Sequence, residues 1–133
     1  MQDLIVFTDG AYSSSRSKGG WAFYVPQLNL RIAGCSTETT INRMEMTAAI
    51  EALKYISETP FKSCNIEIYS DSMYLVGGME LNWRQDVNVD LWNQLNEYKE
   101  NLSVKFIHIN GHSGIEENEI VDKLAVKLSQ SNE

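Results

Sequence analysis

Asp9 and Asp71 each follow a short run of residues that favours a β-strand. Residues 4–7 are apolar, β-branched and aromatic, as expected of a strand buried on both faces, and residues 65–70 repeat the pattern with alternation. A strand, a helix and a second strand in that order predict a parallel pair, whose carboxyl ends meet at one edge of the sheet. Ligand sites form at such edges, so the two carboxylates are placed side by side for chemistry. Two structural alternatives stay open, a turn at Asp9 and a helix cap at Asp71.

Glu45 lies on the apolar face of the most clearly predicted helix, residues 42–56. A buried carboxylate is costly unless hydrogen bonds or a positive partner such as a metal ion meet it. The alternative is a glutamate of the first turn that the helix dipole stabilises. Glu51 is expected to point outward. The apolar stripe around Glu45 consists of Met46, Ala49, Ile50, Ala52, Leu53 and Ile56.

A further helix is predicted over residues 118–128, with Asp122 at the edge of its apolar stripe and Asn118 one turn earlier. Before it, glycines bracket His112 in the segment 111–114, a pattern typical of an exposed, mobile loop. An imidazole there is placed to act as an acid, a base or a proton shuttle; a surface histidine without a role is the alternative. His108, within the strand predicted over residues 104–109, is expected to be packed and not catalytic.

The elements that position these residues follow from the remaining pattern. Residues 11–20 are polar and end in glycines, which predicts a loop. Residues 21–25 and 28–33 predict two strands of an antiparallel meander. The expected fold class is α/β, a five-stranded mixed sheet of three antiparallel and then two parallel strands flanked by helices. We expect residues 1–133 to form a single domain, with residues 129–133 as a frayed tail.

Charge and composition narrow the class of protein. The formal net charge of −7 argues against nonspecific adhesion to nucleic acid, which requires clustered cations. Cys35 and Cys64 are too few for a disulfide scaffold and lack zinc-ligand spacing, so we expect reduced thiols. No stretch is long and apolar enough to span a membrane, and residues 1–3 do not open a secretory signal, so a cytoplasmic protein is expected. A monomer is the default.

Taken in order, five fragments make the chain resemble type 1 ribonuclease H across essentially its whole length. Any one of them would be weak support, whereas five in the same order, each with its carboxylate or histidine, are specific. The fragments are Phe7-Thr8-Asp9-Gly10-Ala11, Thr40-Ile41-Asn42-Arg43-Met44-Glu45-Met46, Tyr69-Ser70-Asp71-Ser72, Gly111-His112-Ser113-Gly114 and Glu117-Asn118-Glu119-Ile120-Val121-Asp122-Lys123-Leu124-Ala125.

The resemblance implies a metal-dependent endoribonuclease that cuts the RNA strand of RNA/DNA hybrids and leaves a 5′-phosphate and a 3′-hydroxyl. It implies two Mg²⁺ ions per site, with Mn²⁺ as an alternative. His112 would assist proton transfer or product release. The implied metal ligands are Asp9, Glu45, Asp71 and Asp122. The substrate contacts expected on the same basis are Gly10, Ser15, Arg16, Thr40, Asn42, Arg43, Met73 and Asn118.

The chain also departs from the family. Residues 79–88 are short and nearly balanced in charge where many relatives carry a longer, basic protrusion, which predicts weak, salt-sensitive hybrid binding. Met73 stands where relatives often have glutamine, so recognition of 2′-hydroxyls is less firmly implied than metal binding. The cations that could touch phosphates are Arg16, Lys18, Arg43 and Arg84, the last beside Trp83.

Other functions remain open at this stage. A noncatalytic hybrid-binding domain would keep the fold, but the chain has little basic surface and retains all four acids. A nuclease or integrase with another substrate would share the architecture. A polymerase or a separate hybrid-binding module could also supply the affinity that this chain lacks.

Overall fold

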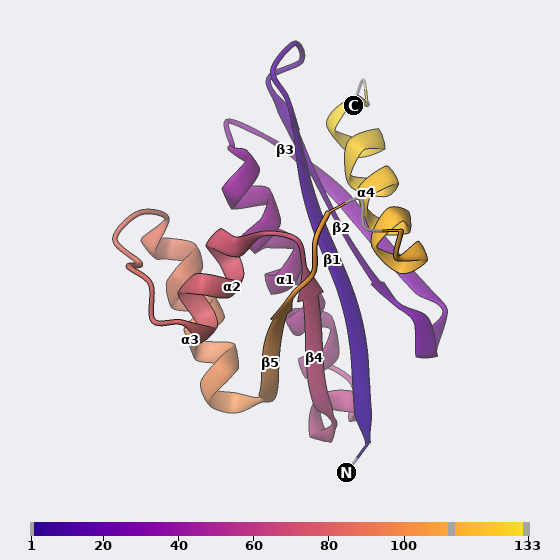
Figure 1. The fold of residues 1–133 in the computed structure, drawn as a ribbon, viewed down its shortest axis with the longest axis vertical. Helices are drawn as coiled ribbons and strands as arrows, with labels where there is room; N and C mark the ends of the chain where they lie inside the picture. Colours follow the sequence, from indigo (N-terminus) through magenta and orange to yellow (C-terminus); the bar gives the residue numbers. More distant parts are fainter. Residues whose placement is uncertain (1, 112–113, 132–133) are drawn as a thin grey trace.

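The computed structural model describes residues 2–111 and 114–131, and within these ranges the chain forms five strands and four α-helices (Figure 1). The strands are β1 (Asp3–Ser13), β2 (Lys18–Val25), β3 (Leu30–Thr37), β4 (Asn65–Ser70) and β5 (Ser103–His108). The helices are α1 (Ile41–Ser57), α2 (Met73–Glu80), α3 (Val89–Asn101) and α4 (Glu116–Ser129). Short 3₁₀ turns cover Pro26–Leu28 and Pro60–Ser63.

The strands form one sheet in the order β3-β2-β1-β4-β5. The ladders β3 with β2 and β2 with β1 are antiparallel, whereas those of β1 with β4 and β4 with β5 are parallel. This arrangement confirms the predicted α/β class and the predicted parallel pairing of β1 with β4. Because β1 occupies the centre, its side chains are covered on both faces, as its continuous apolar run indicates.

The first hairpin is longer than its sequence suggested. Residues 11–20 were expected to be a loop, but β1 continues to Ser13 and β2 begins at Lys18, and Ala11 pairs with Gly20 in the ladder. Only residues 14–17 form the turn. The prediction failed because glycine and serine lower strand propensity locally, whereas the neighbouring strand supplies ladder hydrogen bonds that outweigh it.

Helices cover both faces of the sheet. Alternate residues of a strand point to opposite faces, and in β1 Val6 belongs to the core under α1, while Phe7 packs with Val121 and Ala125 of α4. In Figure 1, α4 lies beside β2 and β1, away from the side on which α1, α2 and α3 gather. The carboxyl ends of β1 and β4 are therefore flanked by helices from both layers.

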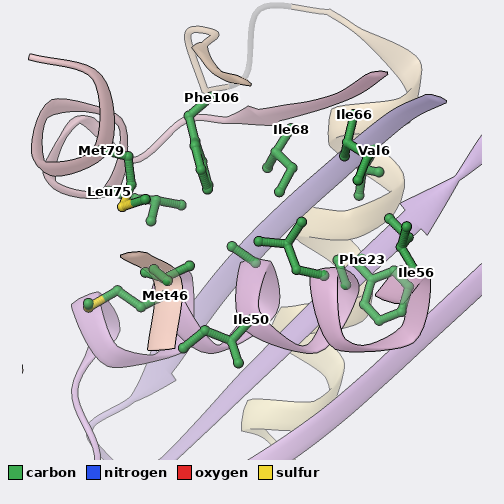
Figure 2. Packing of buried hydrophobic residues seen from close by; sticks show 14 of the residues in the cluster. Val6, Phe23, Met46, Ile50, Ile56, Ile66, Ile68, Leu75, Met79 and Phe106 are labelled. Atoms are coloured by element: carbon green, nitrogen blue, oxygen red, sulfur yellow. The ribbon is translucent and has the colours of Figure 1, made fainter. Parts of the chain in front are cut away.

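The larger core joins the sheet to α1 and α2. Figure 2 shows Ile66, Ile68 and Phe106 of the sheet facing Met46 and Ile50 of α1 across this core, and α2 adds Leu75 and Met79 at its side. Each fully buried side chain of this size contributes roughly 1.5–3 kcal/mol to folding. The whole predicted stripe of α1 is buried, because its 3.6-residue periodicity matches the single face that the sheet covers.

Side-chain caps define the starts of α1 and α2. Thr40 caps α1, accepting a hydrogen bond from the Arg43 N–H at 3.2 Å, and Ser72 caps α2, accepting from the Leu75 N–H at 3.1 Å. The alternative in which Asp71 caps α2 is therefore wrong, since Ser72 fills that position. Asp71 remains available for other contacts.

Two further expectations are corrected. Ser129, predicted to begin a frayed tail, is the last residue of α4 and is only 2% exposed, so the helix extends further than its apolar stripe. His108, predicted to be packed, is exposed because β5 is an edge strand. Among the described residues, no helix has the length and apolarity needed to cross a membrane.

Candidate active site

Asp9 and Asp71 meet where the β1–β4 ladder ends. The last parallel pair joins Phe7 to Tyr69, and Asp9 lies two residues further along β1, opposite Ala22 of β2. Asp71 follows directly after β4. Asp9 thus stands within a strand, so the turn alternative at this position is wrong. The neighbour β4 ends while β1 continues, and this leaves the two carboxylates side by side.

Glu45 reaches the same place from α1. A Cβ built on Gly10 would lie 2.5 Å from the Glu45 backbone nitrogen, so glycine allows the first turns of α1 to lie directly on β1. The Gly10 N–H also donates a hydrogen bond to Asp9 Oδ1 at 2.9 Å. Gly10 therefore supports the site through close packing and through its backbone donor.

One oxygen from each of Asp9, Glu45 and Asp71 lies within 4.8 Å of the others, and among the described residues these three form the group that could hold a metal ion. Asp9 is 2% exposed and Glu45 7% exposed. Burial, followed by the charge of Asp71, raises the pKa of Asp9 from 3.8 to about 8, against hydrogen bonds to Glu45 and Gly10 that lower it. Burial and the neighbouring Asp9 and Asp71 charges raise the pKa of Glu45 well above its ordinary value.

Unsatisfied oxygens mark the place for a cation. Asp9 Oδ2 and Glu45 Oε1 are buried without a hydrogen-bond partner in the described part of the chain, as are Thr8 Oγ1 and Asn118 Oδ1. Buried acceptors without donors are costly, and carboxylate oxygens are the ligands that hard divalent cations prefer. The carboxylates of Asp9, Glu45 and Asp71 therefore fit a divalent metal ion, which would satisfy the open oxygens of Asp9 and Glu45 and offset the repulsion among the three charges.

Asp122 and Asn118 come from α4, on the other layer of the structure. The charge of Asp122 contributes to the raised pKa of Asp9, so the two carboxylates are near one another. Asp122 is partly exposed, and its oxygens do not belong to the group within 4.8 Å. Asn118 is 2% exposed. The structure thus gathers three of the four predicted acids tightly and places the fourth nearby.

The amino end of α1 carries three of the predicted substrate contacts. Thr40 is its cap, and Asn42 and Arg43 are partly exposed in its first turn. The Arg43 guanidinium donates to both Asp90 oxygens, at 3.0 and 2.7 Å, and to Asn88 Oδ1 at 3.2 Å. The sequence did not predict the contacts of Arg43 with Asn88 and Asp90, because residues 45 or more positions apart leave no local pattern.

The remaining predicted contacts differ in their surroundings. Ser15 and Arg16 are exposed in the turn of the first hairpin, and Met73 is a partly exposed residue at the start of α2, two positions after Asp71. Lys18, named among the cations that could touch phosphates, is instead 7% exposed and donates to the backbone oxygen of Ser131. That expectation is wrong, because the side chain turns inward toward α4.

The predicted catalytic histidine, His112, lies outside the described residues. Its neighbour Gly111 approaches the acidic cluster, since a Cβ built there would lie 3.0 Å from Asp71 Oδ2. The segment that leads into the predicted histidine loop is therefore next to the carboxylates. This position is compatible with the predicted role of His112, which remains a prediction.

Comparisons with known proteins agree with this fold. The family model for RNase H matches residues 1–130. Ribonuclease H from Prosthecochloris aestuarii is 37% identical, over 97% of this chain and 97% of its own length. Ribonuclease H from Acetivibrio thermocellus is 34% identical, over 99% of this chain and 98% of its own.

The fold of this chain is similar to that of a solved structure. It is the N-terminal RNase H domain of a Mycobacterium tuberculosis protein fused to maltose binding protein, with a TM-score of 0.82 at 14% identity over 97% of this chain and 94% of that one. The chain belongs to the RNase H family. Its similarity to several ribonucleases H along nearly their full length makes it a hydrolase of the ribonuclease H type.

Proposed function

We propose that the protein is an endoribonuclease that hydrolyses the RNA strand of RNA/DNA hybrids with two Mg²⁺ ions, leaving 5′-phosphate and 3′-hydroxyl ends. The observation that carries the proposal is the meeting of Asp9, Glu45 and Asp71 within 4.8 Å, with buried oxygens that lack partners. Relatives named ribonuclease H that span nearly the whole chain support the reaction class. Mn²⁺ is the alternative ion.

Asp9, Glu45 and Asp71 would hold the ions, with Asp122 as a further ligand from α4. Bound there, Mg²⁺ would supply charge for activating the attacking water and for stabilising the leaving oxygen at phosphorus. The carboxylates must be ionised for this, and the raised pKa values of Asp9 and Glu45 in the metal-free site mean that metal binding releases protons. His112 would carry a proton between the site and solvent.

Substrate would lie across the edge that carries these acids. Thr40, Asn42 and Arg43 at the amino end of α1 would face one strand, since N–H groups at a helix start favour phosphate oxygens. The RNA strand would be contacted by residues that lie beside the carboxylates in the chain or in space. These are Gly10, Met73 and Asn118. Ser15 and Arg16 would reach the backbone from the hairpin turn.

Hybrid affinity is proposed to be low at physiological salt. Arg43 is already paired with Asp90, and Arg84, whose side chain is 92% exposed, lies 3.5 Å from Asp86. Together with the net charge of −7, this leaves few cations for phosphates. A polymerase or a separate hybrid-binding module could supply affinity to a protein that is otherwise a monomer.

The experiment is cleavage of a labelled RNA/DNA hybrid with Mg²⁺, beside matched RNA duplex, DNA duplex and single-stranded RNA. Wild type should cut only the hybrid, and Asp9→Asn should abolish cutting. Asp3→Asn is the matched control, because Asp3 is an exposed carboxylate on the same strand. Phosphatase treatment and end-labelling of the products identify the 5′-phosphate. A wild-type protein that binds the hybrid without cutting it would contradict the proposal and favour a binding module.

A further inference from the structure

The helix that carries Asp122 lies unusually close to β2. A Cβ built on Gly20 would collide with the Ala125 carbonyl oxygen and lie 2.7 Å from the Ser129 backbone nitrogen. Ala22, two residues further along β2, is fully buried in the cluster that contains Val121 and Ala125. Small residues at alternate positions thus let α4 lie directly on one face of this strand.

The contact of α4 with β2 is smooth at Gly20 and Ala22, whereas larger side chains of the same cluster, Phe7 of β1 and Tyr24 of β2, pack with Val121 and Ala125. Gly20 has no side chain to interlock with α4, and Ala22 has only a methyl group. Dispersion contacts between such small groups are weak and change little when one surface slides over the other. A directional contact at the carboxyl end of α4 therefore adds to this packing in fixing the register of the helix along β2.

Lys18 supplies that contact. It is two residues before Gly20 and so belongs to the same face of β2. Its ammonium donates to the Ser131 backbone oxygen at 2.9 Å and to Ser131 Oγ at 3.0 Å, just beyond the end of α4. The residue is only 7% exposed, and a charge buried to this extent must keep its hydrogen bonds. The carboxyl end of a helix also carries partial negative charge, which favours a cation there.

We propose that Lys18 is a positioning residue, which fixes the register of α4 along β2 and thereby holds Asp122 beside Asp9. The ladder supports this link, because Ala22, which packs with Val121, is the direct partner of Asp9 on β1. Val121 immediately precedes Asp122, so a shift of α4 along β2 moves Asp122 relative to Asp9. The inference rests on the proposed role of Asp122 as a metal ligand.

The test compares Lys18→Met, which keeps the length of the side chain and removes its charge, with Lys127→Met. Lys127 is an exposed lysine in the last turn of α4. Its replacement removes a positive charge near the same helix end but leaves the contact between Lys18 and Ser131 in place. Titration calorimetry with Mg²⁺ alone, well below the melting temperature, measures metal affinity. Lys18→Met should weaken Mg²⁺ binding about three- to tenfold, which lies within the range of remote couplings, and Lys127→Met should not.

Two further measurements separate positioning from a general loss of stability. In an Asp122→Asn background, Lys18→Met should leave Mg²⁺ affinity unchanged, because the ligand through which it acts is gone. Lys18→Arg, which keeps charge and donors, should recover most of the affinity. If Lys18→Met lowers the melting temperature but not Mg²⁺ affinity, or weakens binding equally in both backgrounds, the proposal is overturned.

The metal-free protein provides a readout that does not depend on the proposed function. Nuclear Overhauser contacts between Ala22 and the Val121 methyl groups should weaken or shift to neighbouring residues in Lys18→Met and remain in Lys127→Met. If wild type bound no Mg²⁺, the metal site would fail as a proposal, and these contacts would still decide the role of Lys18. Unchanged contacts in Lys18→Met would refute it.

Discussion

Replacing Asp9 with asparagine should stabilise the metal-free protein although it destroys the proposed site. Asp9 is almost completely buried, one of its oxygens lacks a partner in the described part of the chain, and Asp71 repels its charge. Its pKa is raised from 3.8 to about 8, so the folded protein retains a proton there that the unfolded chain has released. Asparagine has nearly the same shape and carries no charge to bury.

The sign and size of the effect follow from proton linkage. Between pH 4 and pH 8 the folded state binds more protons at Asp9 than the unfolded state does, so the free energy of unfolding falls as pH rises through this window. The free energy of unfolding falls by about 1.4 kcal/mol for each pH unit in this window. Because pH 7 lies roughly three units above the unfolded pKa, the loss at pH 7 is about 4 kcal/mol. This is an upper value for Asp9→Asn, because Glu45 shares the site and the buried amide must still find partners.

Urea unfolding in a chelating buffer, from pH 5 to pH 8.5, measures the effect. Wild type should lose stability with rising pH, and Asp9→Asn should be more stable than wild type at pH 7. The free energy of unfolding of Asp9→Asn should also fall less steeply with pH, by an amount that corresponds to about one proton. The exposed carboxylate variant Asp3→Asn should follow wild type. Saturating Mg²⁺ should stabilise wild type and not Asp9→Asn. If wild type and Asp9→Asn had parallel pH profiles and equal stability, the inference that the cluster is strained without metal would be refuted.

Three further outcomes are expected. Ser72→Ala should lower the free energy of unfolding by about 1 kcal/mol in urea titrations, because the α2 cap is lost, and an unchanged midpoint would contradict the capping role. His112→Ala should slow hybrid cleavage with little change in hybrid affinity, and an equal loss of affinity would indicate a substrate contact instead. Arg16→Ala should raise the apparent KM most clearly at moderate salt, and a KM that is the same at every ionic strength would remove Arg16 from the proposed substrate contacts.

The parts of the fold that sequence predicted well are those that a single periodicity defines. The stripe of α1 repeats every 3.6 residues and is buried along its length, with Glu45 inside it as expected. The runs that became β1 and β4 predicted a parallel pair and adjacent positions for Asp9 and Asp71, and the structure confirms both. In each case the local pattern and the tertiary environment favour the same conformation.

The errors occurred where a distant partner decides the local structure. Glycines and serines of residues 11–20 favoured a loop, but the ladder between β1 and β2 extends through Gly20. Lys18 looked like a surface cation until α4 was placed beside it. The contact of Arg43 with Asp90 was likewise not predicted, and the substrate contact of Arg43 stays a prediction. No residue near Lys18 or Arg43 in sequence indicates such a partner, so these contacts required the three-dimensional arrangement.

The acidic cluster links these observations to stability. Gly10 and Gly20 have no side chains, and this lets α1 and α4 bring acidic residues to one edge of the sheet from opposite layers. Such convergence concentrates negative charge where water is excluded, which raises the pKa values of Asp9 and Glu45 and weakens the metal-free fold at neutral pH. A divalent cation reverses this cost by pairing with the same oxygens. The proposed cofactor should therefore stabilise the protein as well as enable its chemistry, and the pH profile of unfolding with and without Mg²⁺ measures both effects on one scale.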